Sequence, residues 1–376
     1  MPAKIDRYTV DRELGSGGMG EVYLAHSPGG DQVAVKLIRS DKHDPETRAR
    51  FEREALIART VIGTGRVARF LNADPFAERP WMAMEYVPGR TLLTCIDADG
   101  VLPSLFVASL GVLLAEGLEA VHAAKLLHRD LKPQNVIMGR DGPMIIDFGL
   151  GAFLDGDSES LSRSGMVVGT IRCMPPEQAR GSSELTTAAD VYALGAVLLY
   201  AAARKFPYDG IGWNAVLAQV TNPDIGPDLH GVPEDLVPLI ASMLAFEPRD
   251  RPTLNDIAGS CISLMESAGR TPVGMRHALI ARTTSGGTSE AAEEPPPALI
   301  ESRDEIGNHE RSPLDEGPED AESDESAPAE LPTPDTGKKE RREVTGPRGQ
   351  RPASSISEAK LVADELRAQY AMSAVL

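Results

Sequence analysis

The residues best suited to chemistry lie in a short polar segment, residues 128–135, which reads HRDLKPQN and is called the polar loop below. It follows a long apolar run with helical periodicity and precedes the strand-like VIM. Charged and amide side chains with a proline make both a poor helix and a poor strand. A carboxylate placed there, such as Asp130, can accept the proton of a hydroxyl group. The position of this loop between apolar elements therefore predicts a site of chemistry.

A second polar position follows directly. The stretch VIMGRDGPMIIDFG contains two short apolar strands, with a turn around Asp141 and Gly142 between them. This pattern predicts a hairpin. Its open end, opposite the turn, would bring Asn135 and Asp147 together although they are twelve residues apart. A carboxamide oxygen and a carboxylate suit Mg²⁺, which keeps much of its shell as water and phosphate.

A glycine-rich stretch near the N-terminus offers contacts of another kind. The sequence GSGGMGEV places Gly15, Gly17 and Gly20 between two predicted strands. Without Cβ atoms, the backbone N–H groups can approach phosphate oxygens. A plain glycine-rich hairpin is the alternative. A dinucleotide-binding fingerprint is not indicated, because a strand rather than a helix follows.

Lys36 ends the alternating run VAVK and can be a solvated strand lysine. The predicted helix that follows argues for a second interpretation. Phe51, Ala55 and Ala58 share one face of this helix, and Glu54 falls on the same stripe. Because a lone buried charge is costly, Glu54 needs a partner, and Lys36 is the natural candidate. An anchored ammonium near the glycine loop can hold phosphates.

Elements that position these residues fall into two groups. The first third reads as short strands and turns, with three strands in a meander up to about residue 40, and helical periodicity dominates from about residue 103. We therefore expect an α+β chain with two lobes. After residue 282 an excess of Pro, Glu, Ser and Gly predicts a disordered tail to residue 354, and residues 355–376 are a candidate amphipathic helix.

Composition excludes several classes of protein. The formal net charge is −18, and residues 281–336 hold 16 acidic and 3 basic residues, so they contribute −13. Without a basic stripe, we do not expect a nucleic-acid binder. The three cysteines are far apart and indicate neither a disulfide framework nor a zinc site. No apolar signal core or membrane span is evident, so we expect a cytoplasmic protein.

Taken in order, these motifs resemble the protein-kinase signature. The matching pieces are the glycine loop with Val22, the VAVK lysine, Glu54, HRDLKPQN, DFG, the PPE of residues 175–177 where the family has APE, DVYALG and the arginine of DRPT. The resemblance covers residues 8–265 and implies a small β-rich lobe (about 8–87) with one major helix, a larger helical lobe (about 88–265), an N-terminal lead (1–7) and a boundary segment (266–281). DLKPQN is typical of the serine/threonine branch.

The resemblance implies a role for each matching residue. Asp130 would be the catalytic base, Lys36 would hold phosphates and pair with Glu54, and Lys132 with Thr170 would steady the γ-phosphate. Asn135 and Asp147 would bind Mg²⁺, with Mn²⁺ as the alternative. The ATP site would comprise Leu14, Gly15, Ser16, Gly17, Gly18, Gly20, Val22, Ala34, Lys36, the gatekeeper Met84, the hinge Glu85 to Val87, and Ile137. His128 would pack, and Asp190 would brace the loop backbone.

Two family positions differ in this chain, and one segment suggests regulation. Cys173 and Pro175 replace the usual tyrosine and alanine in the wall that receives the substrate peptide, so the resemblance implies catalysis but does not carry over a peptide preference. Cys173 is either a small packing side chain or a redox site. Arg129 precedes the catalytic carboxylate, as in kinases whose arginine meets an activation-loop phosphate. The resemblance makes Ser162 and Ser164 the phosphoacceptors, and a solvated polar loop is the alternative.

Within the family, the chain is similar to bacterial, especially actinobacterial, serine/threonine kinases that act on protein substrates. An inactive scaffold acting through the tail is the first alternative, although Lys36, Asp130 and Asp147 are all retained. A small-molecule phosphotransferase is the second, although such enzymes lack the PPE segment. The tail is an acidic spacer, a substrate for autophosphorylation, or an arm that docks a partner. Self-association through the N-terminal lobe is a family option.

Overall fold

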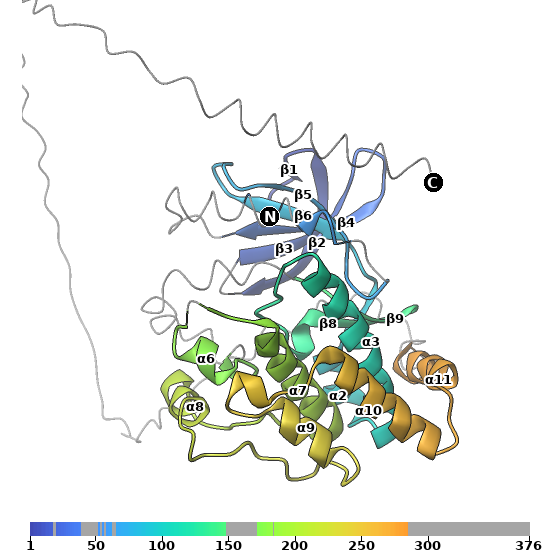
Figure 1. The fold of residues 1–376 in the computed structure, drawn as a ribbon. Coiled ribbons are helices and arrows are strands. Elements are labelled where there is room, and N and C mark those ends of the chain that lie inside the picture. The colour runs from blue at the N-terminus through green and yellow to red at the C-terminus, as the bar shows by residue number, and fades with distance from the viewer. Residues whose placement is uncertain are drawn as a thin grey trace, which may run out of the picture. The chain divides into compact units, whose positions relative to one another are not determined.

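The computed structural model describes residues 1–17, 20–38, 52, 55, 58–61, 65–147, 171–182 and 184–284. Outside the described residues lie Gly18, Glu54, Ser162, Ser164, Thr170 and the segment 285–376. Within the described part, a β-sheet lobe is followed by a helical lobe (Figure 1). The two-lobed α+β architecture expected from the sequence is confirmed.

The N-terminal lobe is a six-stranded antiparallel sheet with the order β1-β2-β3-β4-β6-β5. Its strands are β1 (Lys4–Ile5), β2 (Tyr8–Gly17), β3 (Gly20–His26), β4 (Gln32–Ile38), β5 (Phe70–Asp74) and β6 (Trp81–Glu85). The predicted meander is therefore present as β2, β3 and β4. At Gly20 a Cβ atom would lie 1.8 Å from the carbonyl oxygen of Leu37 and φ is 147°, so the close approach of β3 and β4 requires glycine.

Alternation along β4 places Lys36 on a defined face of this sheet. Val33, Val35 and Leu37 belong to one hydrophobic cluster, and Ala34 belongs to another. The second cluster also includes Leu14, Val22, Met82 and Met84. Because successive strand residues point to opposite faces, Lys36 shares the face of Ala34. The lysine thus lies beside the residues expected to receive the nucleotide.

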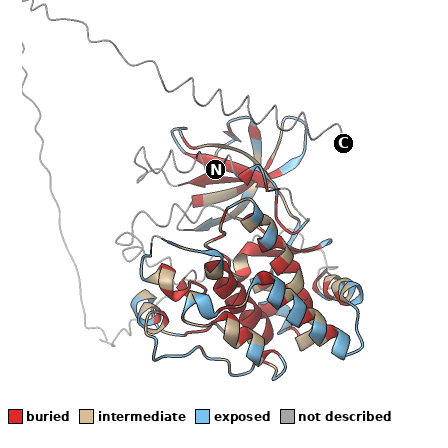
Figure 2. Cartoon of the chain, in the orientation of Figure 1, coloured by how far each residue is buried: buried red, intermediate tan, exposed pale blue. Residues whose placement is uncertain are grey.

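The C-terminal lobe is built on two central helices, α3 and α7 (Figure 2). Its helices are α2 (Leu92–Asp99), α3 (Ser104–Ala123), α6 (Pro176–Ala179), α7 (Thr187–Ala203), α8 (Trp213–Val220), α9 (Val237–Met243), α10 (Leu254–Ser267) and α11 (Pro272–Thr284), with 3₁₀ turns η1 (Pro133–Asn135) and η3 (Pro248–Asp250). All residues of α7 from 189 to 202 are buried, which makes α7 the axis of this lobe.

Helix α3 also meets a membrane criterion. Among the residues that the structure describes, it is the one helix long and apolar enough to cross a bilayer by length and composition, but 61% of its apolar window is buried inside the fold. It packs against α7, α10 and α11. Its apolar surface is thus used in the core of the lobe.

A small sheet in the C-terminal lobe confirms the predicted hairpin. Its strands are β7 (Gly89–Thr91), β8 (Val136–Gly139) and β9 (Gly142–Ile145). In the antiparallel β8–β9 pair, Val136 lies opposite Ile145. Asn135 directly precedes β8 and Asp147 follows β9 by two residues, so both residues lie at the same end of the hairpin.

The C-terminal boundary of the folded part differs from the expectation. Helix α10 continues past residue 265, and α11 fills most of the expected boundary segment 266–281 and extends through 284, where we expected the tail. The buried stripe of α11 consists of Met275, Leu279 and Thr283. Because this stripe is short and ends in a threonine, its apolar periodicity is too weak to reveal the helix from the sequence.

Candidate active site at the junction of the two lobes

A fully buried carboxylate anchors the polar loop. Asp190 of α7 accepts hydrogen bonds from the backbone N–H groups of His128 and Arg129, both at 2.9 Å. It also accepts a 2.7 Å hydrogen bond from Nε2 of His122. Burial acts to raise the pKa of Asp190, but His122 and the other donors outweigh burial, so the pKa lies below its usual value. The loop backbone is thus tied to the most buried helix of the lobe.

These contacts hold an uncommon backbone conformation. Arg129 has φ 63°, in the left-handed region that non-glycine residues rarely adopt. Its N–H group is held by Asp190, and its carbonyl oxygen accepts a 3.0 Å hydrogen bond from Nε2 of Gln178. Both backbone groups of Arg129 are therefore fixed, and the side chains on either side of it take defined directions.

His128 is fully buried and links the polar loop to the segment after β9. Its Nε2–H donates to the carbonyl oxygen of Ile146 at 3.1 Å, which leaves Nδ1 to accept the N–H group of Asp130 at 3.3 Å. Since one ring nitrogen donates and the other accepts, the ring is the neutral Nε2–H tautomer. These contacts agree with the packing role that we predicted for His128.

Asp130 is the centre of a compact polar cluster. Its Oδ2 atom accepts hydrogen bonds from Nζ of Lys132 at 2.8 Å and from Nδ2 of Asn135 at 3.2 Å. Nδ2 of Asn135 also donates to the carbonyl oxygen of Asp130 at 2.8 Å. Burial acts to lower the pKa of Lys132, but the adjacent Asp130 carboxylate more than compensates, so the pKa is raised and Lys132 keeps its positive charge.

Lys36 and Asp147 join the two lobes through an ion pair. Nζ of Lys36 lies 2.8 Å from Oδ2 of Asp147, and the side chains are only 8% and 18% exposed. Burial acts to raise the pKa of Asp147, but the positive charge of Lys36 and its hydrogen bond outweigh burial. The pKa therefore lies below its usual value and the carboxylate stays ionised. We expected Lys36 to pair with Glu54; the partner that the structure describes is Asp147, and Glu54 lies outside the described residues.

The polar atoms at the open end of the hairpin fit a divalent cation that prefers oxygen ligands. The N–H group of Ile146 donates to the carbonyl oxygen of Asn135 at 2.9 Å, which holds the two ends of the hairpin together. The amide nitrogen of Asn135 is used by Asp130, so its amide oxygen is the end available to a cation. Among the described residues there is no group of three or more His, Cys, Asp and Glu that could hold a metal alone. Asn135 and Asp147 therefore fit a hard cation whose other ligands come from phosphate and water.

Several of the residues expected to bind the nucleotide gather around the sheet face that carries Lys36. Leu14 and Val22 pack against the cluster that contains Ala34 and Met84, and Ala34 and Met84 are direct neighbours across β4 and β6. From the C-terminal lobe, Ile137 of β8 is 9% exposed. In the glycine loop, the pairs are Gly15 with Val22, Ser16 with Glu21, and Gly17 with Gly20. The loop is thus the end of the β2–β3 hairpin.

The expected hinge begins at Glu85, the last residue of β6. Its N–H group donates to the carbonyl oxygen of Arg69 at 2.8 Å, and its Oε2 atom accepts hydrogen bonds from the backbone N and from Nε of Arg69, both at 3.2 Å. Val87 follows two residues later and leads into β7. Glu85 is therefore held on the β5 side by several polar contacts, and the hinge starts from a fixed point.

The expected substrate platform contains the two unusual residues. Cys173 is buried, and burial raises the pKa of its thiol to about 12, so the thiol stays protonated at neutral pH. These properties favour packing over redox chemistry. Next to it, Glu177 makes a bidentate ion pair with Arg251 at 2.7 and 2.8 Å, and the Arg251 side chain is 0% exposed. The PPE segment is thus fastened to the body of the lobe.

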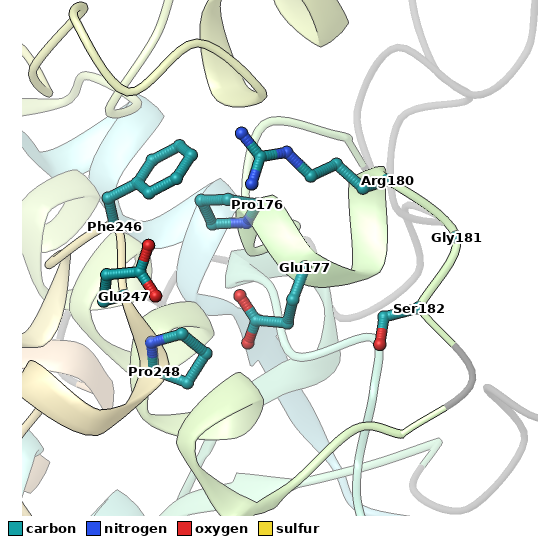
Figure 3. A pocket seen from close by; sticks show the side chains of 8 residues that line it. All are labelled: Pro176, Glu177, Arg180, Gly181, Ser182, Phe246, Glu247 and Pro248. Carbon is teal, nitrogen blue, oxygen red and sulfur yellow. The ribbon is translucent and has the colours of Figure 1, made fainter.

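A pocket of about 260 Å³ is lined in part by this segment (Figure 3). Its lining consists of Pro176, Glu177, Arg180, Gly181, Ser182, Phe246, Glu247 and Pro248. The guanidinium of Arg180 lies 4.5 Å from the centre of the Phe246 ring and donates to the carbonyl oxygen of Thr221 at 2.6 Å. None of the expected catalytic, nucleotide or metal residues lines this pocket, so it is not the site of the chemistry.

Sequence reasoning missed two residues that hold the site. His122 and Gln178 contact Asp190 and the Arg129 carbonyl, respectively, across wide separations in sequence. His122 lies in the last turn of the apolar helix α3. A polar residue at that position only weakly indicates that it has a buried hydrogen-bond partner. Gln178 follows the PPE motif with no pattern of its own. Neither partner can be found without the fold.

Comparison with known proteins agrees with this geometry. The protein kinase domain family model matches residues 8–261. The chain is 38% identical over 303 residues to "Probable serine/threonine-protein kinase PkwA" of Thermomonospora curvata, which covers 79% of this chain and 40% of the relative. It is 40% identical over 257 residues to serine/threonine-protein kinase AfsK of Streptomyces coelicolor, covering 68% and 32%.

A third relative is serine/threonine-protein kinase PknF of Mycobacterium tuberculosis, which is 36% identical over 258 residues, covering 65% of this chain and 53% of the relative. The chain therefore spans about a third to a half of the length of the curated relatives it matches. Because the family model covers well over half of the chain, and its motif residues meet where the family's chemistry needs them, this chain belongs to the protein kinase domain family.

Proposed function

We propose that the chain is an ATP-dependent serine/threonine protein kinase. The observation that carries the proposal is a pair of contacts, Lys36 with Asp147 across the lobes and Asn135 with Asp130 in the polar loop. Lys132 links them, because it contacts Asp130 and is acted on by the charge of Asp147. A charge pair at about 4 Å in an effective dielectric of about 20 is worth about 4 kcal/mol. Fixed charges of this kind stabilise the negative charge on a phosphoryl group during transfer.

In this proposal each residue acts on the nucleotide or on the acceptor. Lys36 contacts the α- and β-phosphates, and the backbone N–H groups of the glycine loop approach the phosphate oxygens. Asn135 and Asp147 would hold Mg²⁺, or Mn²⁺ as the alternative, and the metal would neutralise phosphate charge. Val22, Ala34 and Ile137 would enclose the adenine base.

The acceptor hydroxyl is handled by Asp130 and Lys132. Both described contacts to the Asp130 carboxylate fall on Oδ2, so we assign Oδ1 to the proton of the hydroxyl group. Lys132, which keeps its charge, steadies the transferred phosphoryl group. Because Asp130 is held by the buried framework around Asp190, its carboxylate is positioned before the substrate binds.

Protein serine and threonine hydroxyls are the proposed acceptors, because the polar loop carries the lysine typical of this branch and the relatives bear that name. The cytoplasm, which supplies ATP and keeps thiols reduced, is the proposed compartment for a chain with three free, buried cysteines. An inactive scaffold is the second candidate, and no lost catalytic residue favours it.

Phosphate incorporation from labelled ATP into a peptide library containing serine and threonine tests the proposal. We expect activity from the wild-type chain, and a loss of about 10²- to 10⁴-fold in Asp130→Asn because the proton acceptor is removed. Lys36→Met should lose activity to a similar extent. Matched controls are Asp209→Asn and Lys205→Met, whose side chains are 92% and 41% exposed. Equal incorporation by all five proteins would contradict the proposal.

We further propose that phosphorylation of Ser164, with Ser162, activates the chain through Arg129 and orders Thr170 against Lys132. Support comes from Arg129, whose backbone is fixed at both its N–H and its carbonyl group. A phosphate carries close to two negative charges and pairs well with arginine. The double variant Ser162→Ala, Ser164→Ala should show at least about tenfold lower activity. Full activity of that variant would refute this regulation.

A further inference from the structure

Helix α11 lies beyond the part of the chain that the family model matches. The match ends at residue 261, and α11 spans Pro272–Thr284. Met275, Leu279 and Thr283 are buried, and α11 packs against α3, α10, β8 and β9. The helix is therefore part of the folded body, and it lies against the hairpin that carries Asn135 and Asp147.

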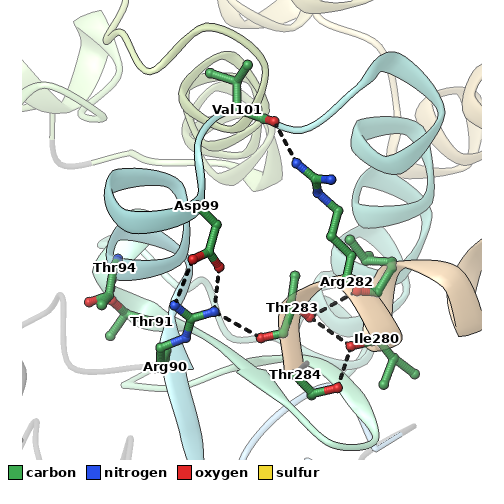
Figure 4. Close-up of polar contacts among 10 residues, drawn as sticks. Arg90, Thr91, Thr94, Asp99, Val101, Ile280, Arg282, Thr283 and Thr284 are labelled. Atoms are coloured by element: carbon green, nitrogen blue, oxygen red, sulfur yellow. Dashed lines mark hydrogen bonds and ion pairs between the residues drawn. The ribbon is translucent and has the colours of Figure 1, made fainter. Parts of the chain in front are cut away.

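Arg90 fastens α11 to the strand that follows the hinge (Figure 4). Its Nη2 atom donates to the carbonyl oxygen of Thr283 at 3.2 Å, and its guanidinium also binds the carboxylate of Asp99 through both nitrogens, at 3.2 and 2.5 Å. Hydrogen bonding to Asp99 raises the pKa of Arg90. One side chain thus connects β7, the end of α2 and the last turn of α11.

A second connection forms at the hairpin turn. The carbonyl oxygen of Asp141 accepts hydrogen bonds from Nη1 of Arg66 at 3.0 Å and from Nη2 of Arg276 in α11 at 3.2 Å. At Gly142, φ is 113°, and a Cβ atom would lie 3.1 Å from Nη1 of Arg66 and 3.7 Å from Ile280 of α11. The turn is therefore held between α11 and the segment that leads into β5.

The strand register carries these contacts to the expected nucleotide site. In the β7–β8 pair, Arg90 lies opposite Met138 and Thr91 lies opposite Ile137, the expected floor of the adenine site. β7 also follows the hinge directly, and Thr91 caps α2 by accepting the N–H group of Thr94 at 3.0 Å. A shift of Arg90 therefore moves the hinge end, the adenine floor and α2 together.

We propose that α11 belongs to the nucleotide-binding unit and that Arg90 is a positioning residue, which couples α11 to the hinge and to the β8 floor of the ATP site. This inference rests on the proposed function, since it concerns the same nucleotide site. Arg90 has no contact with the reacting groups in this account. Its effect should therefore fall on the binding of ATP and leave the transfer step itself almost unchanged.

Steady-state kinetics of the full chain test the proposal. Arg90→Ala should raise the KM for ATP by about five- to tenfold, the size expected for a lost charge-assisted hydrogen bond, with kcat within about twofold of wild type. Arg90→Lys should recover part of the affinity. The matched control is Arg282→Ala in α11. The contacts described for its guanidinium are a hydrogen bond to the Val101 carbonyl at 3.4 Å and a position over the Phe106 ring at 5.7 Å, so both constants should stay unchanged.

A double-variant cycle shows whether Arg90 acts through α11. Leu279→Ala, at a fully buried position of α11, should also raise the KM for ATP. In the double variant with Arg90→Ala, the fold-increase in KM should be smaller than the product of the two single fold-increases. Thermal unfolding of each variant identifies any that do not fold. If Leu279→Ala unfolds, Arg90→Lys and Arg90→Ala decide the question alone.

The possible failures are distinct. A wild-type chain that transfers no phosphate would contradict the proposed function. A wild-type chain that is active, with folded Arg90→Ala of unchanged KM for ATP, would overturn the role of Arg90 and α11. Effects of Arg90→Ala and Leu279→Ala that multiply in full would also overturn it, because Arg90 would then act through Asp99 without the helix.

Discussion

Replacement of Asp147 by asparagine is expected to lower the rate of phosphoryl transfer about a thousandfold while the chain stays folded. The variant keeps the shape of the side chain but removes its negative charge. A charge interaction of about 4 kcal/mol at short range corresponds to about three factors of ten in rate. The ion pair with Lys36, at 2.8 Å, is lost as well, so Lys36 loses this partner and the proposed metal would lose a charged ligand.

Measurement of kcat for ATP-dependent phosphorylation, with circular dichroism of each protein, checks this prediction. The control is Asp141→Asn in the turn of the same hairpin, where the carboxylate is 80% exposed and lies 3.7 Å from Nε of Arg140. That variant should retain full activity because its backbone carbonyl, which the fold uses, is unchanged. Similar activities of the two variants would show that Asp147 does not carry the proposed role.

Replacement of Asp190 by alanine is expected to cost about 3–5 kcal/mol in the free energy of unfolding. The variant leaves two backbone N–H groups of the polar loop and the ring of His122 without their acceptor inside the protein. Each buried, unsatisfied group costs about 1–3 kcal/mol. Because the left-handed conformation of Arg129 is then unsupported, activity should fall with stability.

Urea unfolding of wild type and variant measures this loss, with Asp97→Ala as the control. Asp97 is 42% exposed and accepts hydrogen bonds from Tyr200 and Arg204, so its removal should cost about 1 kcal/mol. The pKa of Asp190 is lower in the folded state than the ordinary value of 3.8. The carboxylate therefore contributes its full stabilisation above about pH 3.8, and this stabilisation is lost as the pH falls through the folded-state pKa. A stability difference that is independent of pH down to strongly acidic conditions would contradict this assignment.

The sequence predicted those features that depend on local patterns. The turn predicted around Asp141 and Gly142 was enough to place Asn135 and Asp147 together, although the two-residue turn in the structure is Arg140 and Asp141 and Gly142 begins β9. The alternating run VAVK likewise indicated a strand, and Lys36 lies in β4. For these residues, neighbours in sequence decide the geometry.

Features that depend on packing between distant segments were not predictable. Lys36 binds Asp147, which is 111 residues away, and no sequence pattern predicted this contact. The partner depends on how the two lobes meet, and no local pattern reports that. Helix α11 was missed for a related reason: its short buried stripe gains its stability from the surface of α3 and the hairpin, not from its own periodicity.

Transfer of the γ-phosphoryl group to a separate protein copy is the decisive test of protein kinase activity. The wild-type chain is incubated with γ-labelled ATP, Mg²⁺ and an Asp130→Asn copy as acceptor, and both ADP and labelled amino acids on the acceptor are measured. We expect phosphoserine or phosphothreonine on the acceptor, with one ADP formed for each phosphate transferred. ADP formation with the label only in inorganic phosphate, or no reaction of ATP at all, would contradict it.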